Sequence, residues 1–297
     1  MTSTAHVPTA DPAVGMSPGD WARWALPGVV WGTSFFFIAE ALEAFPAATI
    51  TPLRVGLGFL TLGLFRAART TRIEGNDRWR ILLLGLIWMA IPLSLFPFAE
   101  QHVSSSVTGM LNGATPIFIT AVAAGMARKL PHTRQIIGLL IGVAGVVLIA
   151  LPSSGDGENS WGGIGLIFIA LVFYGFALNL AVPLQQRYGS LPVLWRTQAV
   201  ALAATLPFAI TGVDDIHFAW RPALSMLGLG VLGTALAYAA MANNAGRLGS
   251  PRASASVYLI PVVSLLLGAL VRNESVAVLS VVGCAVALVG AWLVSRH

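Results

Sequence analysis

The chain has 297 residues, of which 56% are hydrophobic and 10% charged, whereas soluble globular proteins carry about 25% charged residues. This composition excludes a single soluble domain, because one core could not bury so much apolar surface. The formal net charge is +5, but the basic residues form neither a run nor a patch interleaved with aromatic residues, so we expect no nucleic-acid binding.

The chain begins with a segment rich in Pro, Thr and Ala that lacks the basic start and apolar core of a signal peptide. We expect residues 1–23 to form a disordered cytoplasmic tail. Ten apolar segments follow, at about 24–43, 47–67, 79–99, 104–127, 135–152, 162–183, 191–212, 223–245, 253–271 and 276–294. Lipid admits only helices or closed barrels, and runs without period-two alternation indicate helices. The sequence therefore predicts an all-α polytopic membrane protein with ten transmembrane helices.

The basic residues between these segments predict the orientation. With a cytoplasmic N-terminus, thirteen arginines and lysines fall inside and two, Arg221 and Arg272, fall outside. The inside set is Arg23, Arg66, Arg69, Arg72, Arg78, Arg80, Arg128, Lys129, Arg134, Arg187, Arg247, Arg252 and Arg296. By the positive-inside rule, we expect both termini to be cytoplasmic.

The two halves of the sequence resemble each other. "IIGLLIGVAGVVL" (136–148) aligns with "VVGCAVALVGAWL" (281–293) at an offset of 145, and the same offset pairs Pro116 with Pro261. Nearer the start of each half the offset is 143, which pairs Trp31 with Tyr174. Because five is odd, a second five-helix copy must insert upside down.

Inverted repeats are characteristic of transporters, which alternate access around a site at mid-membrane. The expected architecture is therefore two inverted five-helix repeats around a central cavity. Its parts are residues 24–152 (first repeat), 153–161 (periplasmic linker), 162–294 (second repeat) and 295–297 (cytoplasmic tail).

Four segments of the first half carry a family resemblance: "WGTSF", "PLRVGLGF", "SSVTGMLNGATPIF" and "GLLIGVAGVVLI". In their order, spacing and duplication they resemble the EamA-type branch of the drug/metabolite transporter superfamily, over roughly residues 24–294. The resemblance implies a ten-helix carrier with a central cavity. Such carriers most often move amino acids or similar small metabolites out of bacteria, and the aromatic amino-acid exporters form one branch. The resemblance therefore implies a location in a bacterial inner (plasma) membrane.

Two prolines lie near the midpoints of the fourth and ninth segments. Proline removes a helical hydrogen bond, so Pro116 would free the carbonyl of Asn112, and Pro261 that of Val257. Each kink could be purely structural, but their matched positions favour hinges beside the cavity.

Several aromatic residues lie deep within the apolar segments instead of at their ends, where tryptophan usually decorates the interface. Such residues can fill a core or face lipid, but aromatic walls with few polar groups also suit a small-molecule pocket. Asn112 and Asn179 can each donate and accept hydrogen bonds to a zwitterion, although bonding between helices is the alternative for both. The candidate substrate-binding residues are Trp31, Phe35, Trp88, Asn112, Tyr174, Asn179, Tyr238 and Tyr258.

Arg54 and Arg196 interrupt the second and seventh segments at related positions. Their mirrored depths favour a structural role, in which each guanidinium binds helix-end carbonyls or reaches the interface. Capture of a substrate carboxylate is the alternative.

The leading functional prediction is an exporter of amino acids, with aromatic or other apolar side chains, working by alternating access. A broad-specificity drug or metabolite exporter is the alternative, although we see no acid near mid-membrane that would meet a permanent cation. A membrane-embedded enzyme is disfavoured, because the histidines fall in loops, tails or a segment end and form no catalytic constellation. The single Cys284 suggests no disulfide or metal site, and we expect no cofactor. The expected partners are a small-molecule substrate and the lipid bilayer; the oligomeric state stays open, and a monomer is consistent with the sequence.

Overall fold

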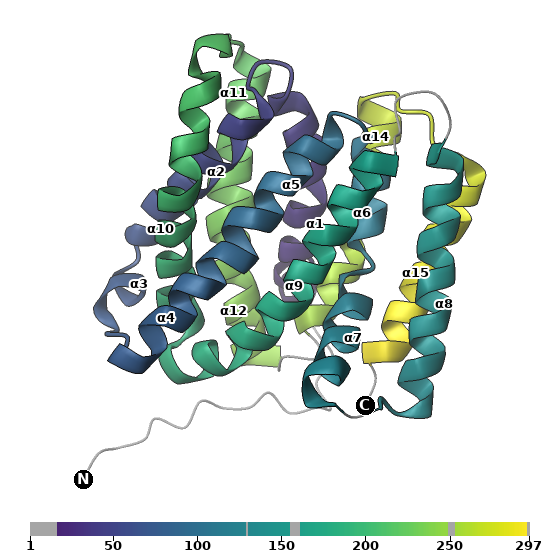
Figure 1. Ribbon diagram of the computed structural model, residues 1–297, viewed down its shortest axis with the longest axis horizontal. Helices are drawn as coiled ribbons and strands as arrows, with labels where there is room; N and C mark the ends of the chain where they lie inside the picture. The colour runs from purple at the N-terminus through teal and green to yellow at the C-terminus, as the bar shows by residue number, and fades with distance from the viewer. Residues whose placement is uncertain (1–16, 129, 155–160, 249–252, 296–297) are drawn as a thin grey trace.

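The computed structural model describes residues 17–128, 130–154, 161–248 and 253–295, and within these ranges the chain is helical with no β-strand (Figure 1). The α-helices are α1 (Pro18–Ala41), α2 (Ala47–Gly63), α3 (Arg66–Thr70), α4 (Gly75–Leu84), α5 (Ile91–Glu100), α6 (Ser105–Asn112), α7 (Thr115–Ala127), α8 (Thr133–Ala150), α9 (Trp161–Tyr188), α10 (Ser190–Ala209), α11 (Trp220–Leu227), α12 (Ala237–Leu248), α14 (Leu259–Val271) and α15 (Val278–Ser295). Two π-helices (Gly85–Ala90 and Gly228–Leu236) and three 3-10 turns (Leu151–Ser154, Ile210–Asp215 and Ala255–Tyr258) complete the set.

The described part of the chain contains six continuous helical stretches that are long and apolar enough to cross a membrane. They are Gly75–Glu100, Ser105–Ala127, Thr133–Ala150, Trp161–Tyr188, Trp220–Arg247 and Val278–Ser295. Two shorter apolar stretches, Ala47–Gly63 and Ala255–Val271, accompany them, while α1 and α10 correspond to the other two predicted segments. The chain is thus a polytopic α-helical membrane protein, and the count of ten spans stays a prediction.

The first helix begins earlier than the sequence analysis expects. Ser17 caps α1, because its Oγ accepts a hydrogen bond from the backbone N–H of Asp20 at 3.2 Å, and Pro18 occupies the first turn. The expected tail of residues 1–23 is therefore wrong for residues 18–23, and the Ser17 to Asp20 capping box was the signal. Residues 1–16, 155–160 of the expected linker, and 296–297 lie outside the described residues.

Irregular segments recur at the offsets found in the sequence. The two π-helices begin at Gly85 and Gly228, which lie 143 residues apart. In the first half, α6 and α7 are separated by a break just before Pro116, and in the second half a 3-10 turn leads into α14 and Pro261. π-helices often mark functional sites, because their wider turns shift backbone partners. The recurrence favours an internal repeat.

Glycines hold α8 and α15 together, and the two helices lie side by side at one edge of the molecule (Figure 1). A Cβ added at Gly145 would lie 2.3 Å from the backbone nitrogen of Ala287, and one at Gly290 would lie 2.4 Å from that of Gly142. The glycine face of the fifth segment therefore serves close helix packing.

Replacing Gly145 by Ala is expected to destabilise the protein by about 1–3 kcal/mol, the usual cost of overpacking a filled interface. Thermal unfolding in detergent would measure this as a lower midpoint than that of the parent. Gly165→Ala is the matched control, since no atom lies within 4 Å of a Cβ there. Equal midpoints for the two variants would contradict the packing role.

Candidate functional site

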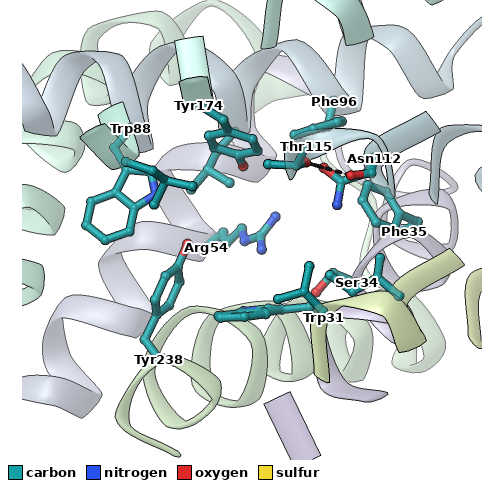
Figure 2. A pocket seen from close by; sticks show the side chains of 14 residues that line it. Trp31, Ser34, Phe35, Arg54, Trp88, Phe96, Asn112, Thr115, Tyr174 and Tyr238 are labelled. Atoms are coloured by element: carbon teal, nitrogen blue, oxygen red, sulfur yellow. Dashed lines mark hydrogen bonds between the residues drawn. The ribbon is translucent and has the colours of Figure 1, made fainter. Parts of the chain in front are cut away.

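A chamber of about 140 Å³ lies at the centre of the helices and has aromatic walls (Figure 2). Its lining comes from both halves of the chain: Trp31, Ser34, Phe35, Arg54, Trp88, Leu93, Phe96, Asn112, Thr115, Tyr174, Leu178, Tyr238, Val257 and Ile260. We call this space the aromatic chamber. Its lining contains one charged side chain, Arg54, and no acid.

Ring contacts fix the aromatic walls. The ring of Tyr238 packs edge-on against Trp31 at a centroid distance of 5.0 Å and against Trp88 at 5.6 Å. Across the chamber, Phe96 packs against Phe35 at 5.5 Å and Tyr174 at 6.0 Å. Such contacts contribute about 0.5–1.5 kcal/mol each beyond burial, so the walls are formed before a substrate binds.

The π-helix Gly228–Leu236 orients two chamber residues. Trp31 donates from Nε1 to the carbonyl of Gly233 at 3.0 Å, and Arg54 donates from Nε to Oγ1 of Thr234 at 2.8 Å. Thr234 in turn donates to the carbonyl of Leu229 at 2.8 Å, and Gln198 donates from Nε2 to the Thr234 carbonyl at 2.6 Å. The π-helix is therefore a scaffold for the site.

Arg54 is 6% exposed, and its guanidinium projects into the aromatic chamber (Figure 2). Among the residues that the structure describes, neither Nη1 nor Nη2 has a hydrogen-bond acceptor, while Nε is held by Thr234. Removing a cation from water is costly unless it is paired. The arrangement thus leaves the outer fork of a buried guanidinium available to an anionic group.

A second cavity of about 390 Å³, the vestibule, continues from the aromatic chamber and shares six lining residues with it. It reaches Gln185 near the end of α9, Ser190 at the start of α10 and Ser295 at the end of α15. The first turn of α1 lies at this end too, where Asp20 pairs with Arg247 of α12 at 3.3 Å. We call this the proximal end.

The opposite, distal end is closed by ion pairs that we call the distal cluster: Glu40, Glu43, Arg221, Arg272 and Glu274. Arg272 binds Glu40 through Nη1 and lies 3.2 Å from Glu43 and 3.7 Å from Glu274, while Arg221 lies 3.0 Å from the second oxygen of Glu40. These pairs tie α1 to the start of α11 and the end of α14. The central cavity is thus open proximally and sealed distally.

Glu274 also caps α6. Its Oε1 accepts from the backbone N–H and hydroxyl of Ser105 at 3.1 and 2.7 Å, and its Oε2 accepts from the N–H of Ser106 at 2.9 Å and from that residue's hydroxyl. A carboxylate is favoured at a helix N-terminus, where N–H groups lack partners. The seal therefore includes α6 as well.

Most of the predicted substrate-binding residues meet at the cavity. The aromatic chamber contains Trp31, Phe35, Trp88, Asn112, Tyr174 and Tyr238, and the vestibule contains Tyr258 and Pro116. Tyr258 is already engaged, because its hydroxyl donates to the carbonyl of Ala291 at 3.0 Å.

Three other candidates lie elsewhere. Asn179 lines neither cavity, because its Nδ2 donates to the carbonyls of Ile119 and Gly175 and so joins α9 to α7. Arg196 donates to the carbonyls of Ala68, Pro192 and Thr71, as expected for a structural clamp. Pro261 is buried against Gly113, where an added Cβ would lie 2.3 Å from its Cγ. Neither cavity contains Pro261 or Arg196.

The two asparagines give a matched test. Asn112→Ala is expected to lower substrate flux about fivefold, equivalent to one neutral hydrogen bond of about 1 kcal/mol, with little change in the unfolding midpoint. Asn179→Ala should instead lower the midpoint, because it removes two hydrogen bonds between partly buried groups. Liposome flux and thermal unfolding measured on both variants would check this, and the reverse pattern would contradict the assignment.

The sequence analysis overlooked Glu100. Both of its carboxylate oxygens are buried and have no hydrogen-bond partner in the described part of the chain. It ends α5, directly after an apolar segment, and an acid at that boundary was the available signal. Among the described residues, no group of three or more His, Cys, Asp or Glu side chains is placed so that it could hold a metal ion.

Apolar helices of spanning length around an internal aromatic cavity, open at one end and sealed at the other, define a membrane protein built to hold a small molecule. Comparison with known sequences gives the family. The chain belongs to the EamA-like transporter family, which it matches over residues 22–151 and again over residues 161–296. It is therefore a membrane transporter that contains the family's unit twice.

Its relatives are consistent with this. An uncharacterized transporter of Archaeoglobus fulgidus is 24% identical over 93% of this chain and 98% of its own length. A probable terminal-alkyne amino-acid exporter of Streptantibioticus cattleyicolor is 26% identical over 93% of this chain and 94% of its own length. A solved crystal structure with 17% identity superposes over 93% of this chain and 96% of that one with a TM-score of 0.59, which supports the fold alone.

Proposed function

We propose that the protein exports amino acids with aromatic or other apolar side chains across a bacterial inner membrane. The observation that carries this proposal is the buried guanidinium of Arg54 in a chamber with aromatic walls: its Nε is bound to Thr234, and its Nη atoms have no acceptor among the described residues. Guanidinium and carboxylate form charge-assisted, often bidentate hydrogen bonds. Aromatic walls suit the apolar side chain of such a substrate.

The remaining polar groups suit the ammonium of an amino acid. Asn112 is 8% exposed, and its side-chain oxygen lies at the chamber beside Thr115. The faces of Trp31 and Tyr238 can attract a cation. A purely cationic drug, by contrast, would meet Arg54 and no acid in the chamber. This argues against the export of permanent cations by the alternative, a broad-specificity drug or metabolite exporter.

The orientation follows from the charges. The loops and helix ends at the proximal end carry most of the basic residues, among them Arg66, Arg69, Arg72, Arg78, Arg80, Arg187 and Arg247. By the positive-inside rule this end is cytoplasmic. The cavity would then face the cytoplasm, ready to load a substrate for export.

For the mechanism, we propose ten spans in two inverted repeats that rock around the aromatic chamber. Outward opening would require the distal cluster to separate and the vestibule to close. The breaks near Pro116 and Pro261 are the proposed hinges, since each repeat has one. The probable terminal-alkyne amino-acid exporter among the relatives, at 26% identity, supports amino acids as the class of substrate.

Flux into and out of liposomes tests the function. We expect labelled tryptophan and phenylalanine to cross faster than in protein-free vesicles, whereas tryptamine, which lacks the carboxylate, is moved poorly. Movement of no amino acid would refute the proposal. Equal movement of tryptophan and of unrelated organic cations would favour the broad exporter instead.

A further inference from the structure

Glu100 is an acid with buried carboxylate oxygens that the proposed transport site does not use. It ends α5 at the distal end, and it does not line the aromatic chamber. Its Oε1 and Oε2 are both buried, and neither has a hydrogen-bond partner within the described ranges. Every carboxylate of the distal cluster, by contrast, is paired.

The charged and titratable groups around Glu100 come from elements that pack against α5 and from the end of α14 and the segment that follows it. Arg54 of α2, Arg272 at the end of α14 and Glu274 beyond it interact with Glu100 electrostatically. Glu40 of α1 is paired with Arg272. Tyr174 of α9 faces the chamber, and His102, in the turn after α5, is exposed to solvent.

Neither of the two nearby arginines forms a hydrogen bond with Glu100, because each has other partners. Arg272 binds Glu40, Glu43 and Glu274, and Arg54 is held at Nε by Thr234 and faces the chamber. Glu274 adds a like charge that interacts unfavourably with an ionised Glu100. The closed distal end thus gives the carboxylate no direct ligand.

An ionised carboxylate without a partner is costly to bury, whereas the protonated carboxyl is neutral. We call the opening that the distal cluster seals the distal mouth. We propose that the distal mouth closes only when Glu100 carries a proton. Closing then takes up one proton per molecule, which converts the carboxylate to the carboxylic acid, and opening releases it. No other reactant is needed.

This makes the distal mouth a pH-sensitive gate. When the mouth opens, water reaches Glu100 and Arg272 is freed from Glu40, so the ionised form is stabilised there. Acid on the outer side therefore favours the sealed, inward-facing state, which returns an exporter to its loading position. The inference rests on the alternating access of the proposed function, but not on the identity of the substrate.

Pulsed electron paramagnetic resonance in nanodiscs, without substrate, tests the gate. Spin labels at Phe218→Cys and Leu270→Cys, in a Cys284→Ser background, span the mouth at positions that are 71% and 74% exposed. For the parent we expect the ratio of closed to open populations to rise as the pH falls from 8 to 5. The limit for one linked proton is about tenfold per pH unit.

Glu100→Gln is neutral at every pH, so its mouth should stay closed with a ratio that no longer depends on pH. Glu43→Gln is the matched control: Glu43 also contacts the gate through Arg272, but its side chain is 51% exposed, and the variant should keep the parental pH response. The proposal is overturned if the closed-to-open ratio of the parent does not change with pH. It is also overturned if Glu100→Gln shows the same pH dependence as the parent. Because no substrate is present, failure of amino-acid flux would leave these outcomes unchanged.

Discussion

Replacing Arg54 by Gln should lower the flux of tryptophan at low substrate concentration by roughly 10- to 100-fold. Hydrogen bonds to a charged group contribute about 1.5–3 kcal/mol, and each 1.4 kcal/mol corresponds to about a tenfold change in affinity. The side chain is the only charged group in the chamber lining, and the described structure offers its Nη atoms no other acceptor. Initial rates in liposomes, normalised to folded protein, measure the effect.

A selectivity measurement separates carboxylate recognition from general damage. The parent should transport tryptophan far better than tryptamine, and Arg54→Gln should bring the two rates together. Arg54→Lys keeps the charge but loses the bidentate fork, so it should retain partial flux. Arg196→Gln is the structural comparison, because it removes hydrogen-bond donors to three carbonyls. It should lower the unfolding midpoint without changing the ratio of the tryptophan rate to the tryptamine rate. An Arg54→Gln variant with parental selectivity would rule out the assignment.

The position of a residue within its apolar segment predicts several of the residues that line the chamber. Trp31, Trp88 and Tyr174 were selected because each lies far from a segment end, and all three line the chamber. Depth alone could not do the same for Asn179, because a residue at cavity depth can face a neighbouring helix. Which side of α9 faces the chamber depends on how the bundle packs, and α9 is apolar nearly all round.

The role of Arg54 also depended on information that the sequence lacks. Its symmetry with Arg196 suggested one role for both, yet only Arg196 binds backbone carbonyls. The difference arises from the π-helix Gly228–Leu236, which presents Thr234 to Nε and leaves the rest of the guanidinium in the chamber. A π-helix is a shift of backbone hydrogen bonds and has no compositional signature in an apolar segment. The sequence therefore singles out Arg54 but does not predict where its side chain points.

In the proposed mechanism, the distal cluster would let a charge-poor protein switch between two states. Its ion pairs cross between helices and would separate when the distal end opens, whereas the aromatic contacts of the chamber lie within its walls. Closure therefore depends on a few groups that water can solvate as soon as the mouth opens. Substitutions at the less exposed members of the cluster, such as Glu40 and Arg272, should shift the equilibrium between states more than the stability of the fold.

Arg272→Gln should open the distal mouth. Glu40 is 2% exposed, and the variant leaves it with Arg221 as its one remaining cation in the described structure. Breaking a buried ion pair costs about 3–5 kcal/mol, and this cost falls on the closed state, because in the open state Glu40 is hydrated. The closed-to-open ratio is expected to fall by roughly 100- to 4,000-fold. Spin labels at Phe218→Cys and Leu270→Cys would report a longer distance at neutral pH.

Two further variants make the prediction specific. Arg221 also contacts Glu40, but its side chain is 73% exposed, so Arg221→Gln should change the ratio little. Adding Glu40→Gln to Arg272→Gln should restore much of the closed population, because a neutral amide no longer requires a cation. If the double variant stays open, the loss of Arg272 acts through another contact, such as the one with Glu274 that holds α6. If Arg272→Gln keeps the parental distance, the distal cluster is not what holds the mouth shut.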